Sequence, residues 1–109
     1  MNVRQLLTFH EVMCREAHAL CERKNSDYAG SGGQHPFRNF TAVESLGLAK
    51  TEVGLVVRMV DKINRLVTFL NDGKLTLENE GAHDSLLALI NYAIILGAYI
   101  ESGDDHADD

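Results

Sequence analysis

The sequence lacks most of the residues that interrupt helices. Its 109 residues include one proline, Pro36, which follows the only glycine-rich stretch, residues 29–35. Outside that stretch the composition permits helix nearly everywhere, and neither a β-hairpin signal nor an internal repeat is found. The sequence therefore predicts an all-α protein.

Long basic runs and targeting signals are missing too. The chain has a net charge of −6, whereas a protein that coats DNA or RNA needs a basic face, so nucleic acid is not an expected partner. Residues 1–5 lack the layout of a secretory signal. The apolar run 86–100 is shorter than the ~20 residues of a membrane span and is interrupted by Asn91. We therefore expect a cytoplasmic protein without a membrane partner.

Cysteine is scarce. Cys14 and Cys21 lie seven residues apart on one predicted helix, an axial separation of ~10.5 Å that exceeds the reach of a disulfide within one chain. Both fall on the apolar face of that helix, which predicts small core residues in a reducing compartment. A symmetric disulfide between two chains stays open as an alternative.

Helical periodicity predicts three long helices, over about residues 3–23, 49–71 and 80–102. A loop is expected over 25–39. Thr41 and Glu44 form a capping-box pattern that would open a short helix, and Gly47 would close it. We expect one antiparallel helical bundle over residues 1–102, followed by an acidic disordered tail, 103–109.

The third long helix predicts self-association. Its Leu and Ile residues point in nearly every direction, and two other helices of a small chain cover only part of such a surface. Each Leu or Ile left exposed forgoes ~1.5–3 kcal/mol. We therefore expect a homodimer or a higher oligomer with this helix in the interface.

One face of the second long helix is charged, and carries Arg58, Asp61, Lys62 and Arg65. The three cations suit phosphate oxygens, and Asp61 suits a metal ion bound to them. The same spacing fits a solvated ladder of paired charges. The pattern leaves both interpretations open.

Two acids at the start of the third long helix, Glu80 and Asp84, lie one turn apart on the same edge as Asn91. Such a pair repels unless a cation or a basic group intervenes, and carboxylate oxygens suit Mg²⁺. Asp61 could supply a third ligand. Acids also favour helix N-termini for reasons unrelated to metals.

Aromatic residues are concentrated in the predicted loop, at Tyr28, Phe37 and Phe40. Such rings either pin a loop to the bundle or stack on a flat ligand such as a base. The glycine-rich stretch lacks the Gly-Lys-Ser/Thr ending of a phosphate-binding P-loop, so that motif is excluded.

Together these motifs resemble a known family. Over residues 9–101 they follow in this order: Lys24-Asn25-x-Asp27-Tyr28, Pro36-Phe37-x-Asn39-Phe40, Arg58-x-x-Asp61-Lys62-x-x-Arg65, Glu80-x-x-x-Asp84 and Asn91-Tyr92-Ala93-Ile94. The order resembles the nucleotide-modification-associated domain 1 family of phages and prophages. That family is similar to the MazG-type all-α nucleoside-triphosphate pyrophosphohydrolases, oligomeric enzymes whose Glu and Asp residues hold Mg²⁺.

The resemblance implies a site for a small nucleotide, in the cytoplasm of a bacterial host. It implies Glu80 and Asp84 as catalytic residues and, together with Asp61, as ligands of Mg²⁺. The remaining candidates it implies are Arg58, Lys62, Arg65 and Lys24 for phosphate, Tyr28, Phe37 and Asn39 for the base, and Asp27 and Asn91 without an assigned role.

Two departures from the family pattern concern catalysis. Ala88 stands where we expect relatives to carry an Asp, and the second long helix lacks the Glu-x-x-Glu pair of MazG-type enzymes. Losing a carboxylate weakens metal binding and removes a base that could activate water. Three hypotheses follow: a Mg²⁺-dependent nucleotide pyrophosphohydrolase, a protein that captures a nucleotide without hydrolysing it, and a dimeric scaffold of a phage complex.

Overall fold

The computed structural model describes residues 1–28 and 36–103, with residues 26–28 described by their backbone alone. These residues form four helices and no strand: α1 (Val3–Tyr28), α2 (Arg38–Ser45), α3 (Thr51–Asn71) and α4 (Glu80–Ser102). The predicted all-α class, with three long helices and a short one, is confirmed. The predicted acidic tail lies, apart from Gly103, outside the described residues.

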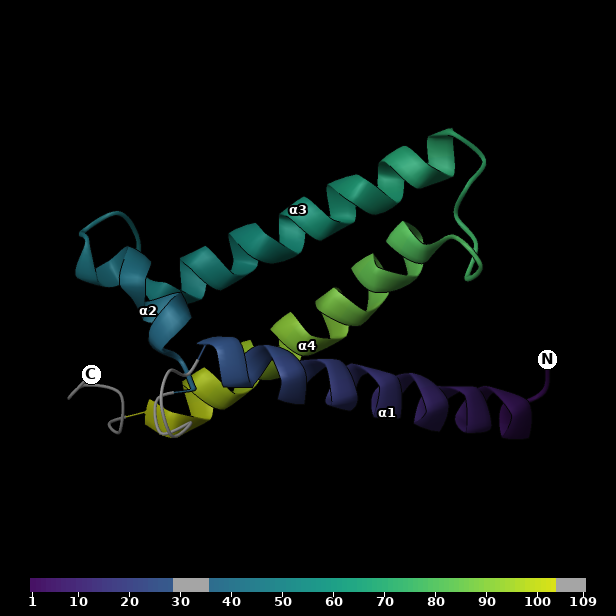
Figure 1. The fold of residues 1–109 in the computed structure, drawn as a ribbon, viewed down its shortest axis with the longest axis horizontal. Coiled ribbons are helices and arrows are strands. Elements are labelled where there is room, and N and C mark those ends of the chain that lie inside the picture. Colours follow the sequence, from purple (N-terminus) through teal and green to yellow (C-terminus); the bar gives the residue numbers. More distant parts are fainter. Residues whose placement is uncertain (29–35, 104–109) are drawn as a thin grey trace.

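The helices are arranged around α4 (Figure 1). α3 and α4 form an antiparallel hairpin, as predicted, and α1 packs on α4 while α2 packs on α3. α1 runs in the same general direction as α4 and crosses it, so that α1 and α3 diverge (Figure 1). Within the described part of one chain, the three long helices therefore do not close into a bundle.

Two predicted helix boundaries were wrong. α1 continues beyond residue 23 to Tyr28, because no glycine or proline precedes Gly30. α2 begins before Thr41, whose hydroxyl donates to the Arg38 carbonyl at 3.2 Å within the helix. Glu44 Oε1 instead accepts a hydrogen bond from the Thr51 amide at 2.9 Å, and so caps α3. The expected capping box of the short helix is absent because its carboxylate serves the next helix.

The predicted helix ends at glycine are confirmed. Gly47 and Gly73 have φ of +75° and +70°. After each glycine the chain folds back on the helix: the Leu48 amide donates to the Val43 carbonyl at 2.9 Å, and the Lys74 amide to the Phe69 carbonyl at 2.7 Å. This is the Schellman geometry, which satisfies carbonyls that a helix end leaves unpaired.

The core is small and lies where α1 crosses α4. Met13, Ala17 and Leu87 are buried there, with partly buried apolar neighbours from both helices. Two polar contacts join the same helices. The Asn91 side-chain amide donates to the Ala17 carbonyl at 3.0 Å, and His83 Nε2 lies 2.6 Å from Glu16 Oε2. The crossing is therefore held by apolar packing and by directional bonds.

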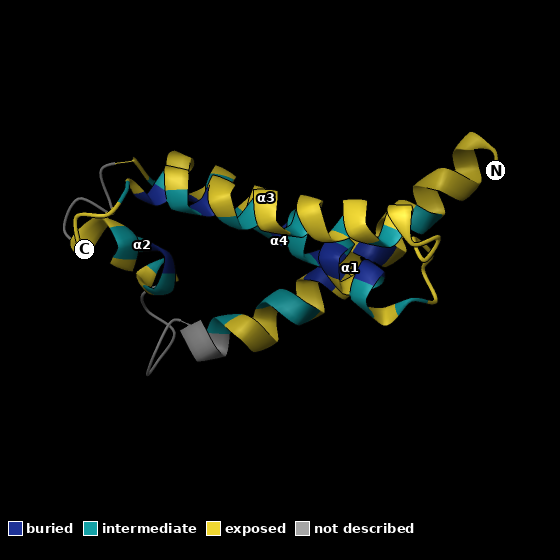
Figure 2. Ribbon diagram, turned by 90° about the horizontal axis from the view of Figure 1, so that it is seen from above, coloured by how far each residue is buried: buried dark blue, intermediate teal, exposed yellow. Residues whose placement is uncertain are grey.

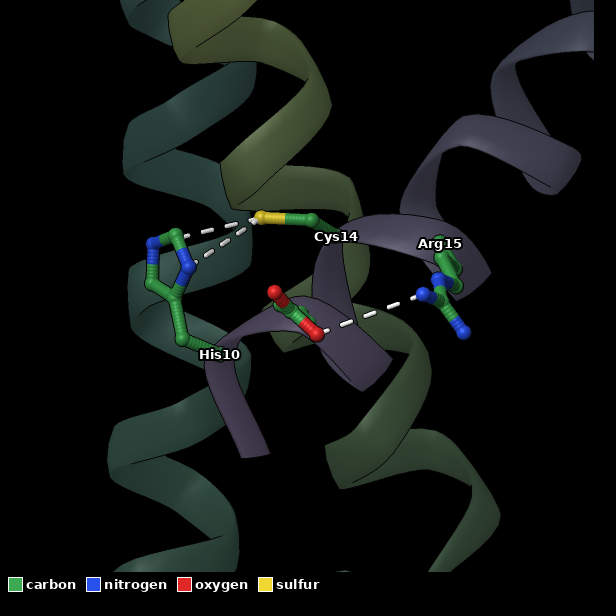
Figure 3. Close-up of polar contacts among 4 residues, drawn as sticks. His10, Cys14 and Arg15 are labelled. Atoms are coloured by element: carbon green, nitrogen blue, oxygen red, sulfur yellow. Dashed lines mark hydrogen bonds and ion pairs between the residues drawn. The ribbon is translucent and has the colours of Figure 1, made fainter. Parts of the chain in front are cut away.

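The prediction that both cysteines are core residues was wrong for Cys14, which is exposed. Its sulfur lies 3.8 Å from His10 Nδ1, one turn away on α1, and Arg15 lies 4.0 Å from Glu11 on the same helix (Figure 3). Only part of α1 contacts α4, so its N-terminal half is mostly uncovered (Figure 2). Periodicity identified an apolar face, but no neighbouring helix covers its full length.

The uncovered apolar surface differs from the expected one. α4 is packed from two sides, and only Ile94 and Ile100 among its large apolar residues are exposed. The outward face of α3 is instead exposed (Figure 2), and it is rich in valine. α4 alone among the described helices has the length and composition of a membrane span. Core helices of soluble proteins share that composition, so the absence of a membrane partner stays a prediction.

Gly54 allows α2 to pack closely on α3. A Cβ at Gly54 would meet Val43 Cγ2 at 2.9 Å, whereas a Cβ at Gly97 would have no neighbour within 4 Å. Val43 is β-branched and stiff, so a methyl group at residue 54 would push the helices apart. We expect Gly54→Ala to lower the free energy of unfolding by about 1 kcal/mol net, since the ~1 kcal/mol gain in helix propensity offsets part of the clash.

Gly97→Ala is the matched control and should raise the free energy of unfolding by about 0.5–1 kcal/mol, because only the helix propensity changes. Urea denaturation of both variants measures the difference. Equal stabilisation by the two substitutions would contradict the close contact of α2 with α3.

Candidate functional site

A cavity of about 280 Å³ lies between the C-terminal part of α1, the start of α2 and the second half of α4. Most of its walls are apolar. The lining residues are Leu20, Cys21, Lys24, Asn25, Pro36, Phe37, Phe40, Ala88, Asn91, Tyr92, Ile94, Ile95 and Ala98.

Aromatic contacts hold α2 against α4 and so shape the cavity. The Phe37 ring packs edge to face on Tyr99, with 5.4 Å between centroids, and the Phe40 ring packs likewise on Tyr92, with 6.3 Å between centroids. Phe40 is buried, whereas Phe37 is half-buried and lines the cavity. Of the two alternatives for these rings, Phe40 pins the segment to the bundle, and Phe37 keeps a surface that a ligand could contact.

Three residues that the family resemblance implied share this cavity: Lys24, Phe37 and Asn91. Their motifs are separated by up to 67 positions in the sequence and meet only because α1 crosses α4 beside α2. Lys24 is exposed, so its ammonium group is accessible to a ligand, and Asn91 is buried. The cavity thus combines an aromatic ring, a buried amide and one cation.

Asn91 presents a hydrogen-bond acceptor. Its Nδ2 donates to the Ala17 carbonyl, an assignment that is unambiguous because a carbonyl oxygen only accepts. Its Oδ1 has no hydrogen-bond partner within the described ranges 1–28 and 36–103. Among the lining residues that the structure describes, Asn91 is also the only buried polar side chain. A ligand that donates a hydrogen bond would find this acceptor on a residue that lines the cavity.

Arg58 does not line the cavity. Its guanidinium carbon lies 4.8 Å from the centroid of the Phe40 ring and 6.0 Å from that of Tyr92. A cation over an aromatic face is attracted by the ring quadrupole. Arg58 therefore joins α3 to the aromatic cluster that forms a wall of the cavity, a contact that neither sequence interpretation of the charged face had included.

The rest of the charged face points elsewhere. Asp61 and Arg65 are exposed, and Lys62 Nζ lies 3.9 Å from Asp61 Oδ2, its neighbour in sequence. No ion pair joins Asp61 to Arg58 or to Arg65 among the described side chains. The charge ladder, one of the two interpretations that the sequence left open, is thus not formed, and the four residues do not act as one unit within the chain.

The predicted metal ligands are not gathered either. Two contacts define how α3 and α4 are aligned: Gly81 of α4 lies against Phe69 of α3, and Tyr92 of α4 lies near Arg58 of α3. In an antiparallel pair with this alignment, Asp61 lies opposite residue 89. Asp84 is five residues before that point, or about 7.5 Å along the helix. Both acids are exposed, as is Glu80. In the described part of the chain, no three His, Cys, Asp or Glu side chains form a group that could hold a metal ion.

The other implied residues divide into two groups. Asn39 is half-buried on α2 but does not line the cavity. The side chains of Asp27 and Tyr28 lie outside the described residues. Sequence reasoning missed the cavity walls supplied by Leu20, Ile95 and Ala98, since apolar residues on a helix give no sign of which ones border a ligand. It also missed the Glu16–His83 contact, which joins residues 67 positions apart.

The cation–π contact of Arg58 predicts a role in stability. Arg58→Met keeps most of the aliphatic stem but removes the charge, and should lower the free energy of unfolding by about 1–2 kcal/mol. Arg65→Met is the matched control on an exposed position of the same helix, and should stay within about 0.5 kcal/mol. Thermal and urea unfolding measure both. Unchanged stability of Arg58→Met would contradict the stabilising cation–π contact and would leave Arg58 as a candidate phosphate ligand.

Comparisons with known proteins found no matching family model, no similar curated protein and no similar solved structure. The similarity to nucleotide-modification-associated and MazG-type proteins therefore stays a prediction from the five sequence motifs.

Proposed function

We propose that the protein captures a small nucleotide in the cavity between α1, α2 and α4 without hydrolysing it. The observation that carries this proposal is that Lys24, Phe37 and Asn91, from three motifs, line one cavity. In this proposal the chain is a phage-type protein of the bacterial cytoplasm, as its motifs predict.

Each of the three residues has a distinct part in the proposed complex. The base enters the apolar interior and contacts the Phe37 ring, as bases do on aromatic side chains in single-stranded nucleic-acid sites. The volume of about 280 Å³ lies at the low end for ligand pockets, which suits a base with its sugar and phosphates outside. Lys24, the only charged residue among the described side chains that line the cavity, is then available to the phosphates.

The polarity of Asn91 favours adenine among the bases. The buried amide offers the acceptor Oδ1 and one remaining Nδ2 hydrogen, since Ala17 engages only one of the two. Burying a carbonyl oxygen without a donor costs about 1–3 kcal/mol. Adenine matches this pair of groups, because its amino group can donate to Oδ1 while the adjacent N7 accepts from Nδ2. We therefore propose an adenine nucleotide as the ligand.

Hydrolysis with Mg²⁺ is the alternative function. It requires that Asp61, Glu80 and Asp84 converge on a metal ion near the phosphates. The three exposed carboxylates do not meet within one chain, and Ala88 at the cavity wall supplies no further ligand. Carboxylates from a second copy would have to complete such a site. Capture needs no group beyond those that already line the cavity, which is why we prefer it.

Binding of AMP and ATP tests the capture proposal. Lys24→Ala should weaken binding of both about 10-fold or more, since a charge-assisted phosphate contact is worth about 1.5–3 kcal/mol. Arg4→Ala, at the far end of α1, should leave the affinity unchanged. Isothermal titration calorimetry measures binding, and chromatography after incubation with Mg²⁺ should recover ATP intact. Released pyrophosphate would favour the hydrolase, and the absence of binding by any nucleotide would favour a scaffold.

A comparison of AMP with IMP tests the proposed role of Asn91. AMP carries an amino group at position 6 of the base, whereas IMP carries an oxo group there and a proton on the adjacent ring nitrogen. We expect AMP to bind about 10-fold more tightly or better, since the 6-oxo group and N7 of IMP are both acceptors and would leave Oδ1 without a donor. Lys24→Ala serves as the control and should weaken both ligands equally. Equal affinities would refute the choice of adenine and leave capture standing.

A further inference from the structure

α3 carries a second apolar face that no other part of the described chain covers. We define the α3 stripe as six residues whose exposed fractions lie between 46% and 61%: Val53, Val56, Val60, Ile63, Val67 and Leu70. The face that packs on α4 and α2 is a different one, with Thr51 and Leu55 buried. α1 lies against α4 rather than α3, and leaves the α3 stripe open.

The spacing of the α3 stripe is that of a coiled-coil seam. Its members follow one another at intervals of three, four, three, four and three residues, which is the heptad pattern of knobs-into-holes packing. A helix that packs into such a seam needs the same spacing.

Apart from Glu52 in the first turn, this side of the helix carries no charge. The neighbouring positions on one flank of the α3 stripe hold Val57, Asn64 and Asn71, and none is charged. All three are exposed. The charged residues from Arg58 to Arg65 lie on other sides of α3. A helical face of this length with charge only at its first turn is typical of a contact with protein rather than with water.

We infer that the α3 stripe is the contact with a second copy of this chain, packed helix against helix about a twofold axis. A second copy provides a seam of identical spacing, as isologous contacts require. The six residues and Val57 expose roughly 600 Å² per copy, a large part of the roughly 800 Å² that each partner buries in a standard interface. This contact uses α3, not α4 as the apolar pattern of the sequence predicted.

The test measures the molar mass in solution of the wild-type protein and of variants that carry a glutamate in the α3 stripe. The full-length protein should sediment as a dimer, at twice the 12.0 kDa of one chain. Val60→Glu and Ile63→Glu should each raise the dimer dissociation constant about 30-fold or more, since each buries an unpaired carboxylate at the centre of the contact. Leu48→Glu, at an apolar residue that is 75% exposed outside the α3 stripe, is the matched control and should leave the constant unchanged.

A milder variant guards against loss of folding. Val60→Thr keeps the shape of the side chain and places a hydroxyl in the seam, so it should weaken the dimer less than Val60→Glu while the helical circular dichroism stays that of the parent protein. Wild-type protein that is monomeric at about 100 µM, far above the dissociation constants of stable dimers, would overturn the inference. So would a dimer that both glutamate variants leave intact, or one that Leu48→Glu disrupts equally. If the protein is monomeric and binds lipid vesicles, and if Val60→Glu abolishes that binding, the α3 stripe contacts a membrane and the inference of a dimer is wrong.

Discussion

The hydrogen bond from the Asn91 amide to the Ala17 carbonyl fixes the point where α1 crosses α4. It is buried, so water cannot substitute for either partner, and a lost bond would leave a polar group unsatisfied in the core. The apolar contacts of Met13 and Leu87 surround it. Because the cavity lies beside this crossing, the bond both positions α1 as a wall and orients Oδ1 as an acceptor. Stability and the proposed recognition of a nucleotide thus depend on one side chain.

The residues on the charged face of α3 have different roles although they share one helical pattern. Arg58 contacts the Phe40 and Tyr92 rings and so holds α2, α3 and α4 together beside the cavity. Asp61 and Arg65, on the same face, remain exposed. The difference arises from α2, which covers only the first part of α3. A residue on the charged face therefore becomes structural where an aromatic ring is in reach and stays hydrated elsewhere.

The small core explains why the outward face of α3 matters. Few side chains in the described chain are fully buried, and valines on α3 are left about half exposed. A domain of about 100 residues buries a modest fraction of its surface, and further burial through association adds stability that the core alone does not provide. A second copy on α3 would also leave the cavity accessible, since the α3 stripe includes none of its lining residues.

Rules that act within a few neighbouring residues were sufficient to predict the helices and most of their ends. The long helices α3 and α4 begin and end within two residues of the predicted positions, and Gly47 and Gly73 terminate helices as expected. These features depend on periodicity and on the freedom of glycine to adopt positive φ, which act within a few neighbouring residues. The helical extension to Tyr28 and the Glu44 cap of α3 escaped prediction because an aromatic, polar segment resembles a loop and because a cap can come from another helix.

The site could be predicted only in part. Motif resemblance indicated Lys24, Phe37 and Asn91 separately, but not that they line one cavity, nor that Arg58 lies on aromatic rings. The separation of Asp61 from Asp84 along the α3–α4 hairpin was equally hidden. A helical pattern reports which side of a helix is apolar or charged. Which helix faces that side depends on the crossing angle and register of α1, α3 and α4, and these arise from packing between residues far apart in the chain.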